Sequence, residues 1–142
     1  MRELDNLVRA GQLKKETCTA SEFSGLLRSG RARLLDARNT ALSFESRFDL
    51  AYNAAHALSL AALRWHGYRS EKRYLVFQAL QHTLGIGAKH WRVLAKCHER
   101  RNLSEYEGQL ELDNQLLSDL LSVTELVWSK VSALDPGGVR KT

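Results

Sequence analysis

One helical face in the second half of the chain changes from apolar to polar within two turns. At spacings of three and four residues this face carries, in order, Trp91, Leu94, Ala95, His98, Arg101, Asn102, Glu105 and Tyr106. Burying a guanidinium without a partner is costly, so we expect Arg101 to be paired or to line an open cleft. An arginine beside an amide and a phenol can hold a phosphate. The alternative is that the helix ends here and its polar residues are solvated.

The charges of the chain are segregated. From Arg64 to Arg101 there are nine Lys or Arg against two Glu, whereas from Glu105 to Asp135 there are seven acids against one Lys. A basic surface of this kind attracts the phosphates of a nucleotide or of RNA. Two neighbouring helices that neutralise each other would produce the same pattern, so both interpretations stay open.

Two segments resemble a known family. The segment His98–Gly108, HERRNLSEYEG, resembles the R-N-x-x-x-H/Y signature of HEPN domains, which are four-helix bundles named for nucleotide binding. The segment Arg47–His56, RFDLAYNAAH, is similar to the small and aromatic pattern of the first HEPN helix. The resemblance covers about residues 40–135. The matching motif positions are Arg101, Asn102 and Tyr106.

The resemblance implies two kinds of function. Many HEPN proteins are metal-independent ribonucleases, often toxins, in which two copies of the motif meet at a homodimer interface. There Arg101 would stabilise charge on the scissile phosphate, Asn102 would orient the site, and Tyr106 or His98 would transfer a proton. Other HEPN proteins are non-catalytic scaffolds for nucleotide or RNA. The protein partners implied are an antitoxin or a nucleotidyltransferase.

Tyr106 stands where catalytic members of the family have a histidine. A phenol with a pKa of about 10 is a poorer general base at neutral pH than an imidazole with a pKa of about 6.5. The substitution favours the non-catalytic group. His98, or His56 on the same side of its helix as Tyr52, could supply the missing imidazole, so these three residues are candidate substrate-binding residues.

The spacing of the cysteines and histidines does not match a structural zinc site. Cys97 and His98, with His82 or His90, lack the ligand spacing that such a site requires, so we expect no metal and no cofactor. In the non-catalytic alternative, Arg101 is held in an ion pair with Glu105 or with an acid of the last helix, and the same surface docks a partner protein. A third possibility is a purely structural bundle.

The elements that position these residues are predicted to be all α-helical. The 142-residue chain has a single proline, Pro136, and no alternating β-branched run. Apolar stripes predict four long helices: one from about Leu42 to Gly67, one N-capped by Ser70 and ending at Gly85, one from Ala88, and one N-capped by Asp113. A staple between Leu112 and Leu117 would support the last of these. Short connections favour an up-and-down four-helix bundle over residues 40–135.

Residues 1–39 are predicted to form a short helical N-terminal arm packed on the bundle. Leu4 and its neighbours indicate one short helix ending near Gly11, and a capping box at Thr19 indicates a second that ends near Gly30. Residues 136–142 are expected to be a flexible tail. The first residues lack the apolar stretch of a secretory signal and no run is long enough for a membrane span, so we expect a cytoplasmic protein.

Overall fold

The computed structural model describes residues 1–108 and 113–139. Within that part the chain is mostly helical, as the sequence predicted. The helices are α1 (Arg2–Arg9), α2 (Ala20–Ala37), α3 (Phe44–Trp65), α4 (Arg73–Gln78), α5 (Leu80–Thr83), α6 (Ala88–Glu107), α7 (Asn114–Val131) and the single-turn η1 (Pro136–Gly138). Among them, no helix is both long enough and apolar enough to cross a membrane.

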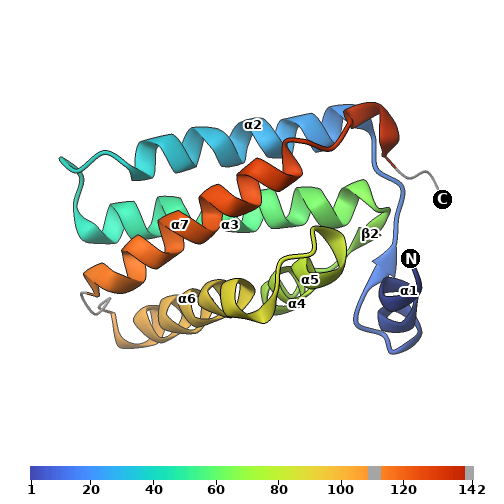
Figure 1. Cartoon of the computed structure of the whole chain (residues 1–142). Coiled ribbons are helices and arrows are strands. Elements are labelled where there is room, and N and C mark those ends of the chain that lie inside the picture. The colour runs from blue at the N-terminus through green and yellow to red at the C-terminus, as the bar shows by residue number, and fades with distance from the viewer. Residues whose placement is uncertain (109–112, 140–142) are drawn as a thin grey trace.

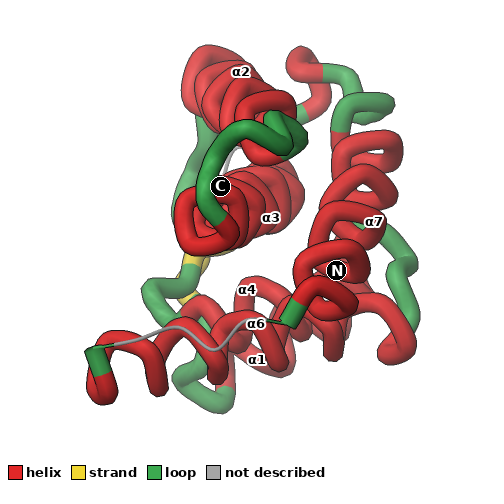
Figure 2. Tube along the Cα trace, turned by 90° about the vertical axis from the view of Figure 1, so that its left-hand side faces the viewer, coloured by secondary structure: helices red, strands yellow, loops and turns green. Residues whose placement is uncertain are grey.

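The long helices lie side by side around one apolar core. Helix α2 packs along α3, and α7 packs against both of them, while α6 packs against α7 and the short α4 (Figures 1 and 2). The core includes the fully buried Phe48, Leu58, Leu94, Leu120 and Val127. Through these contacts one end of α6 faces the middle of α3, which is where the candidate polar residues lie.

At two positions, polar side chains cap a helix N-terminus as the sequence predicted. The Thr19 hydroxyl accepts a hydrogen bond from the backbone N–H of Glu22 at 3.0 Å. The Asp113 carboxylate accepts one from the N–H of Leu116 at 2.9 Å. Each bond satisfies an otherwise unpaired amide of the first turn. The predicted partner of Leu117, Leu112, lies outside the described residues.

The predicted ends of two helices were wrong. The helix that begins after Thr19 does not end at Gly30 but continues to Ala37, and it is one of the long helices of the fold. The helix expected from Ser70 to Gly85 is instead two short helices, α4 and α5, that meet at Ala79. Ser70 does accept a hydrogen bond, but from the N–H of Lys72, before α4 begins.

A small antiparallel sheet, which the sequence did not predict, ties the N-terminal segment to the end of α3. Strand β1 (Lys14–Lys15) pairs with β2 (Tyr68–Arg69), with Lys14 opposite Arg69. Each strand has only two residues, and a buried arginine beside the pair stabilises it by donating a hydrogen bond to the carbonyl oxygen of Tyr68 in β2. Such a short pair leaves no alternating sequence pattern to find.

That arginine is Arg64, which is 2% exposed and therefore contributes nothing to a basic surface. Its guanidinium donates to both carboxylate oxygens of Glu22, at 3.0 and 3.1 Å, and to the carbonyl oxygens of Glu16, Thr17 and Tyr68. A buried guanidinium is tolerated because its N–H donors are satisfied in this way. Arg64 thus joins α2, the β1 segment and α3.

The last residues of the described chain pack on the end of α3. Residues 136–138 form η1, and the indole nitrogen of Trp65 donates to the carbonyl oxygen of Asp135 at 2.8 Å. Val139 is buried in the core cluster. Residues 140–142 of the predicted tail lie outside the described residues.

Candidate functional site

Tyr52 is the centre of the candidate site. Its ring, on α3, is fully buried, and two guanidiniums and one imidazole surround it. The guanidinium of Arg73, on α4, lies 5.4 Å from the ring centroid, and that of Arg101, on α6, lies 5.0 Å from it. The His98 ring stacks with it at 6.2 Å and an interplanar angle of 11°. Both guanidiniums are attracted by the same aromatic ring, so they lie within about 10 Å of each other.

His98 is fixed through both of its ring nitrogens. Nδ1 lies 2.7 Å from the Tyr52 hydroxyl oxygen, and Nε2 lies 3.3 Å from the amide nitrogen of Asn102. With that amide donating, Nε2 is the acceptor and Nδ1 carries the proton. Burial, together with the charges of Arg73 and Arg101, lowers the pKa of His98 below its usual value. The imidazole is therefore neutral at neutral pH.

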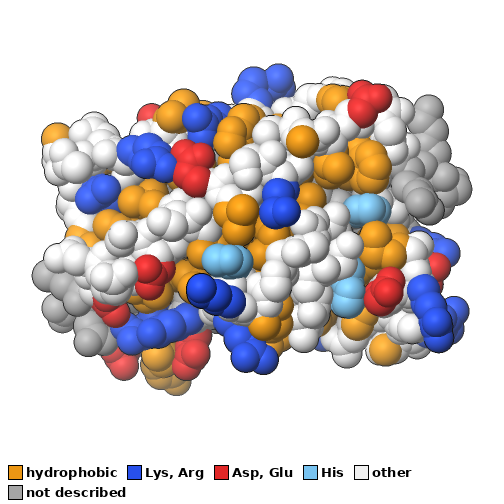
Figure 3. All heavy atoms as spheres, viewed as in Figure 1, with side chains coloured by type: hydrophobic (Ala, Val, Ile, Leu, Met, Phe, Trp, Pro, Cys, Tyr) orange, Lys and Arg blue, Asp and Glu red, His pale blue; other side chains and the backbone are white. Residues whose placement is uncertain are grey.

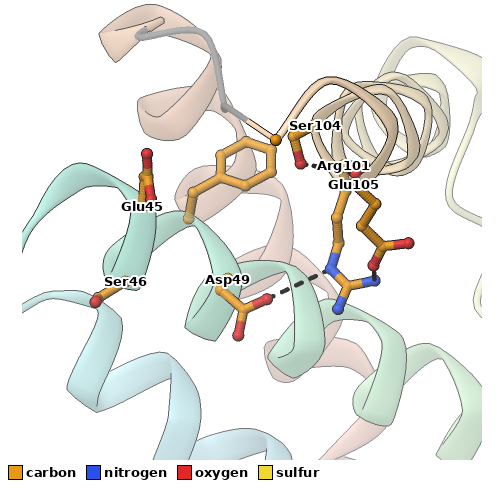
Figure 4. A pocket seen from close by; sticks show the side chains of 8 residues that line it. Glu45, Ser46, Asp49, Arg101, Ser104 and Glu105 are labelled. Atoms are coloured by element: carbon orange, nitrogen blue, oxygen red, sulfur yellow. Dashed lines mark hydrogen bonds and ion pairs between the residues drawn. The ribbon is translucent and has the colours of Figure 1, made fainter.

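Arg101 is held in two exposed ion pairs (Figure 4). Its Nε lies 3.4 Å from a carboxylate oxygen of Asp49 on α3, and its Nη1 lies 3.1 Å from one of Glu105 on α6. The Arg101 side chain is 29% exposed, whereas those of Asp49 and Glu105 are 58% and 65% exposed. Exposed pairs of this kind contribute about 0–1 kcal/mol each, so an incoming anion can replace either carboxylate at small cost.

Arg73 is the second cation of the site, and no described carboxylate forms an ion pair with it. Its Nη1 donates to the side-chain oxygen of Asn53 at 3.2 Å, and its guanidinium lies over the Tyr52 ring. Its charge lowers the pKa values of both His98 and His56. The two carboxylates that pair with Arg101 balance the formal charge of the two arginines, and within the described residues Arg73 has no carboxylate of its own.

His56 lies at the inner edge of the same cluster. Its ring meets that of Phe77 edge-on at 6.2 Å, and Phe77 in turn meets His98 at 6.5 Å. Burial, and then the charges of Arg73 and His98, lower the pKa of His56 to about 4. His56 also lines a shallow cavity with Asn53 and Asp49, but the structure puts it beside Arg73 rather than beside Tyr106.

The structure brings five of the six candidate residues together around Tyr52 and places Tyr106 in an adjoining groove that His98 and Asn102 also line. Arg101 and Asn102 lie near Tyr52 and His98, and His56 is one ring further along. The Tyr106 side chain is 94% exposed and lines a different cavity from Arg101. On the face drawn in Figure 3, acidic and basic side chains intermingle where Figure 1 places the end of α6.

Sequence reasoning missed Arg73 as a site residue and the role of Asp49. Arg73 was one basic residue among nine, and the packing of α4 on α3 brings it next to Tyr52. Asp49 forms an ion pair with Arg101 across the α3–α6 contact, which a single sequence does not indicate. Among the described residues, no group of three His, Cys, Asp or Glu lies close enough to hold a metal ion.

Comparison with models of known families, with curated proteins and with solved structures found no match.

Proposed function

We propose that the chain binds the phosphate groups of RNA or of a nucleotide between Arg73 and Arg101. The observation that carries the proposal is the pair of guanidiniums over one buried tyrosine ring, one of them without a described carboxylate partner. Guanidiniums recognise phosphate through several parallel N–H donors. The resemblance of the α6 motif to HEPN domains points to the same ligand class.

We further propose that α2, α3, α6 and α7 form an up-and-down four-helix bundle that carries this site. These four long helices pack on one another. The short α4 packs on α6 and carries Arg73, whose guanidinium lies over the Tyr52 ring. This departs from the bundle expected over residues 40–135, because α2 takes the place expected for the helix that is divided into α4 and α5. A homodimer remains an expectation from the family resemblance, and a cytoplasmic location remains an expectation from the sequence.

Within this proposal the chain is a metal-independent endoribonuclease that uses His98 rather than Tyr106 as its base. Nε2 of neutral His98 takes the proton from a ribose 2′-hydroxyl, and the 2′-oxygen attacks the adjacent phosphorus. The bond from phosphorus to the 5′-oxygen breaks, and that oxygen takes a proton from water. Arg73 and Arg101 balance the charge of the phosphorane, and the products end in a 2′,3′-cyclic phosphate and a 5′-hydroxyl.

A second candidate function is a non-catalytic module that docks a partner protein. The observation in its favour is that Arg101 already has two carboxylate partners, Asp49 and Glu105. In addition, Leu103 and Tyr106 are exposed on the neighbouring side of α6. In that case Arg101 stiffens the end of α6, and an antitoxin or a nucleotidyltransferase binds beside it.

The experiment that tests these functions measures RNA binding and RNA cleavage in EDTA by the wild type and four variants. We expect Arg73→Ala and Arg101→Ala each to weaken binding of a labelled RNA about tenfold and to reduce its salt dependence. Arg9→Ala, which removes an exposed arginine of α1, is the matched control. Cleavage that yields cyclic-phosphate ends and disappears in His98→Gln would establish the nuclease.

Two results would redirect the proposal. Binding that depends on Arg73 and Arg101 without any cleavage would leave an RNA-binding or nucleotide-binding protein with no nuclease activity. Wild-type protein that binds neither RNA nor nucleotide, while remaining folded, would exclude the proposed function and favour the docking module.

A further inference from the structure

A groove beside Arg73 and Arg101 combines aromatic and basic side chains, and most of the residues that line it have no part in the function proposed above. It runs along one face of α6 and is closed on one side by Tyr74 of α4. The residues that line it include Tyr74, Arg92, Lys96, His98, Asn102 and Tyr106.

Two tyrosine side chains that line this groove are exposed to solvent. Tyr74 is 45% exposed and Tyr106 is 94% exposed, and Leu103 between them is 48% exposed. The Tyr74 ring is held from one side by Trp91, whose ring meets it edge-on at 6.1 Å. A tyrosine fixed in this way offers an ordered flat surface, and burying large apolar side chains against a ligand is favourable.

The charge of the groove matches a nucleic acid strand. Within the described chain neither Arg92 nor Lys96 forms an ion pair, and the single acid that lines the groove is Glu99. Arg92 instead lies over the Trp91 ring, 5.7 Å from its centroid. Aromatic rings interleaved with unpaired cations are the combination that holds single strands, because bases stack on the rings while the cations follow the phosphates.

Two residues connect the groove with the site formed by Arg73 and Arg101. His98 and Asn102 line the groove, and the hydrogen bonds of His98 join it to Tyr52, over which both Arg73 and Arg101 lie. A phosphate held by Arg73 and Arg101 would therefore have its neighbouring nucleotides directed along α6. From Lys96 to Tyr106 the helix rises about 15 Å, room for more than one base.

We propose that this groove is a base-stacking subsite that makes the chain selective for single-stranded RNA, with bases on Tyr74 and Tyr106. The inference rests on the proposed function, since it extends the same phosphate site. In a duplex the bases are already stacked on one another and cannot reach the tyrosine rings. Tyr106 therefore has a role as a stacking residue, different from the proton transfer that its motif position implies.

The test compares binding of a fluorescein-labelled RNA strand of mixed sequence with binding of the same strand annealed to its complement, by anisotropy. We expect Tyr106→Ala to weaken single-strand binding about tenfold and to leave duplex binding within twofold. Tyr106→Phe should retain single-strand binding because it keeps the ring. Leu35→Ala, at an exposed leucine of α2, is the control for loss of exposed apolar surface.

The outcomes separate this inference from the function beneath it. Equal weakening of single-strand and duplex binding by Tyr106→Ala, or no weakening of either, would overturn the stacking subsite while Arg101→Ala still tests the phosphate site. A Tyr106→Ala variant that changes the sedimentation coefficient of the free protein would also overturn it, since the groove would then be a contact between copies of the chain. Wild-type protein that binds no RNA would overturn both proposals.

Discussion

The hydroxyl oxygen of Tyr52 lies 2.7 Å from Nδ1 of His98 and couples a fully buried residue of α3 to the polar end of α6. With the Asn102 amide donating to Nε2, the Tyr52 oxygen accepts the hydrogen bond from Nδ1, and it does so from inside the core, where water cannot compete. Burial also raises the pKa of Tyr52 above its usual value, so the phenol stays protonated. The proposed base is thus positioned by a residue that touches no ligand.

Removal of that hydroxyl should therefore change the tautomer of His98. In Tyr52→Phe we expect a loss of about 1 kcal/mol in the free energy of unfolding, because Nδ1 loses a buried partner. The ¹⁵N chemical shifts of the imidazole should report a proton on Nδ1 in the wild type and a mixture in the variant. Tyr74→Phe, at an exposed tyrosine, should change neither quantity. A wild-type imidazole protonated on Nε2 would contradict the assignment of the Asn102 amide as the donor to that nitrogen.

The carboxylate of Asp49 competes with any phosphate for Arg101. Asp49→Asn should tighten RNA binding by about two- to fivefold, because it frees the guanidinium and removes a repulsive charge. The free energy of unfolding should change by less than about 1 kcal/mol, since the ion pair is exposed. Glu45→Gln neutralises another carboxylate of the same cavity that has no ion pair with Arg101 and is the matched control. Unchanged binding in Asp49→Asn would favour the docking module.

His56 should make the fold sensitive to mild acid. Its pKa is about 4 in the folded protein against an ordinary 6.5, so the unfolded chain binds the proton more readily. The stabilisation is present above pH 6.5 and is lost as the pH falls from 6.5 to 4, with about 3 kcal/mol as an upper value. Urea unfolding across this range should show a smaller decrease for His56→Gln than for the wild type. His90→Gln, away from the cluster, should follow the wild type, and equal decreases in all three would exclude His56 as the cause.

The sequence predicted the helical class and the helix that carries the candidate residues, because both depend on local periodicity. Helix α6 begins at Ala88 as expected, and Arg101 and Asn102 follow one another on it. The approach of Arg73 to Tyr52 could not be predicted, since it depends on how α4 packs on α3. Asn102 and Tyr106, which are four residues apart, line one groove, whereas Arg101 lines a different cavity, because residues near one another on a helix can face different neighbours.

Glycine predicted the helix ends near Gly11, Gly67 and Gly85 correctly and failed at Gly30. Gly67, with φ of 87°, does follow the end of α3, where a left-handed backbone favours glycine. Gly30 has the same residue type but lies inside α2, fully buried against α3. There the reason for glycine is the close approach of two helices, and a single sequence does not distinguish this reason from a helix end.

Gly30 is therefore expected to be intolerant of even one methyl group. A Cβ at this position would lie 2.6 Å from Cδ2 and 2.7 Å from Cγ of Leu58, which is fully buried and has no free space to move into. We expect Gly30→Ala to lower the free energy of unfolding by about 1–3 kcal/mol, despite the better helix propensity of alanine. Gly25→Ala on the same helix meets only the end of the Arg28 side chain, at 3.9 Å, and should raise stability by up to about 1 kcal/mol. Opposite signs for the two variants in urea unfolding would establish that α2 is locked against α3 at Gly30, whereas stabilisation in both would mean that the two helices can separate there without cost.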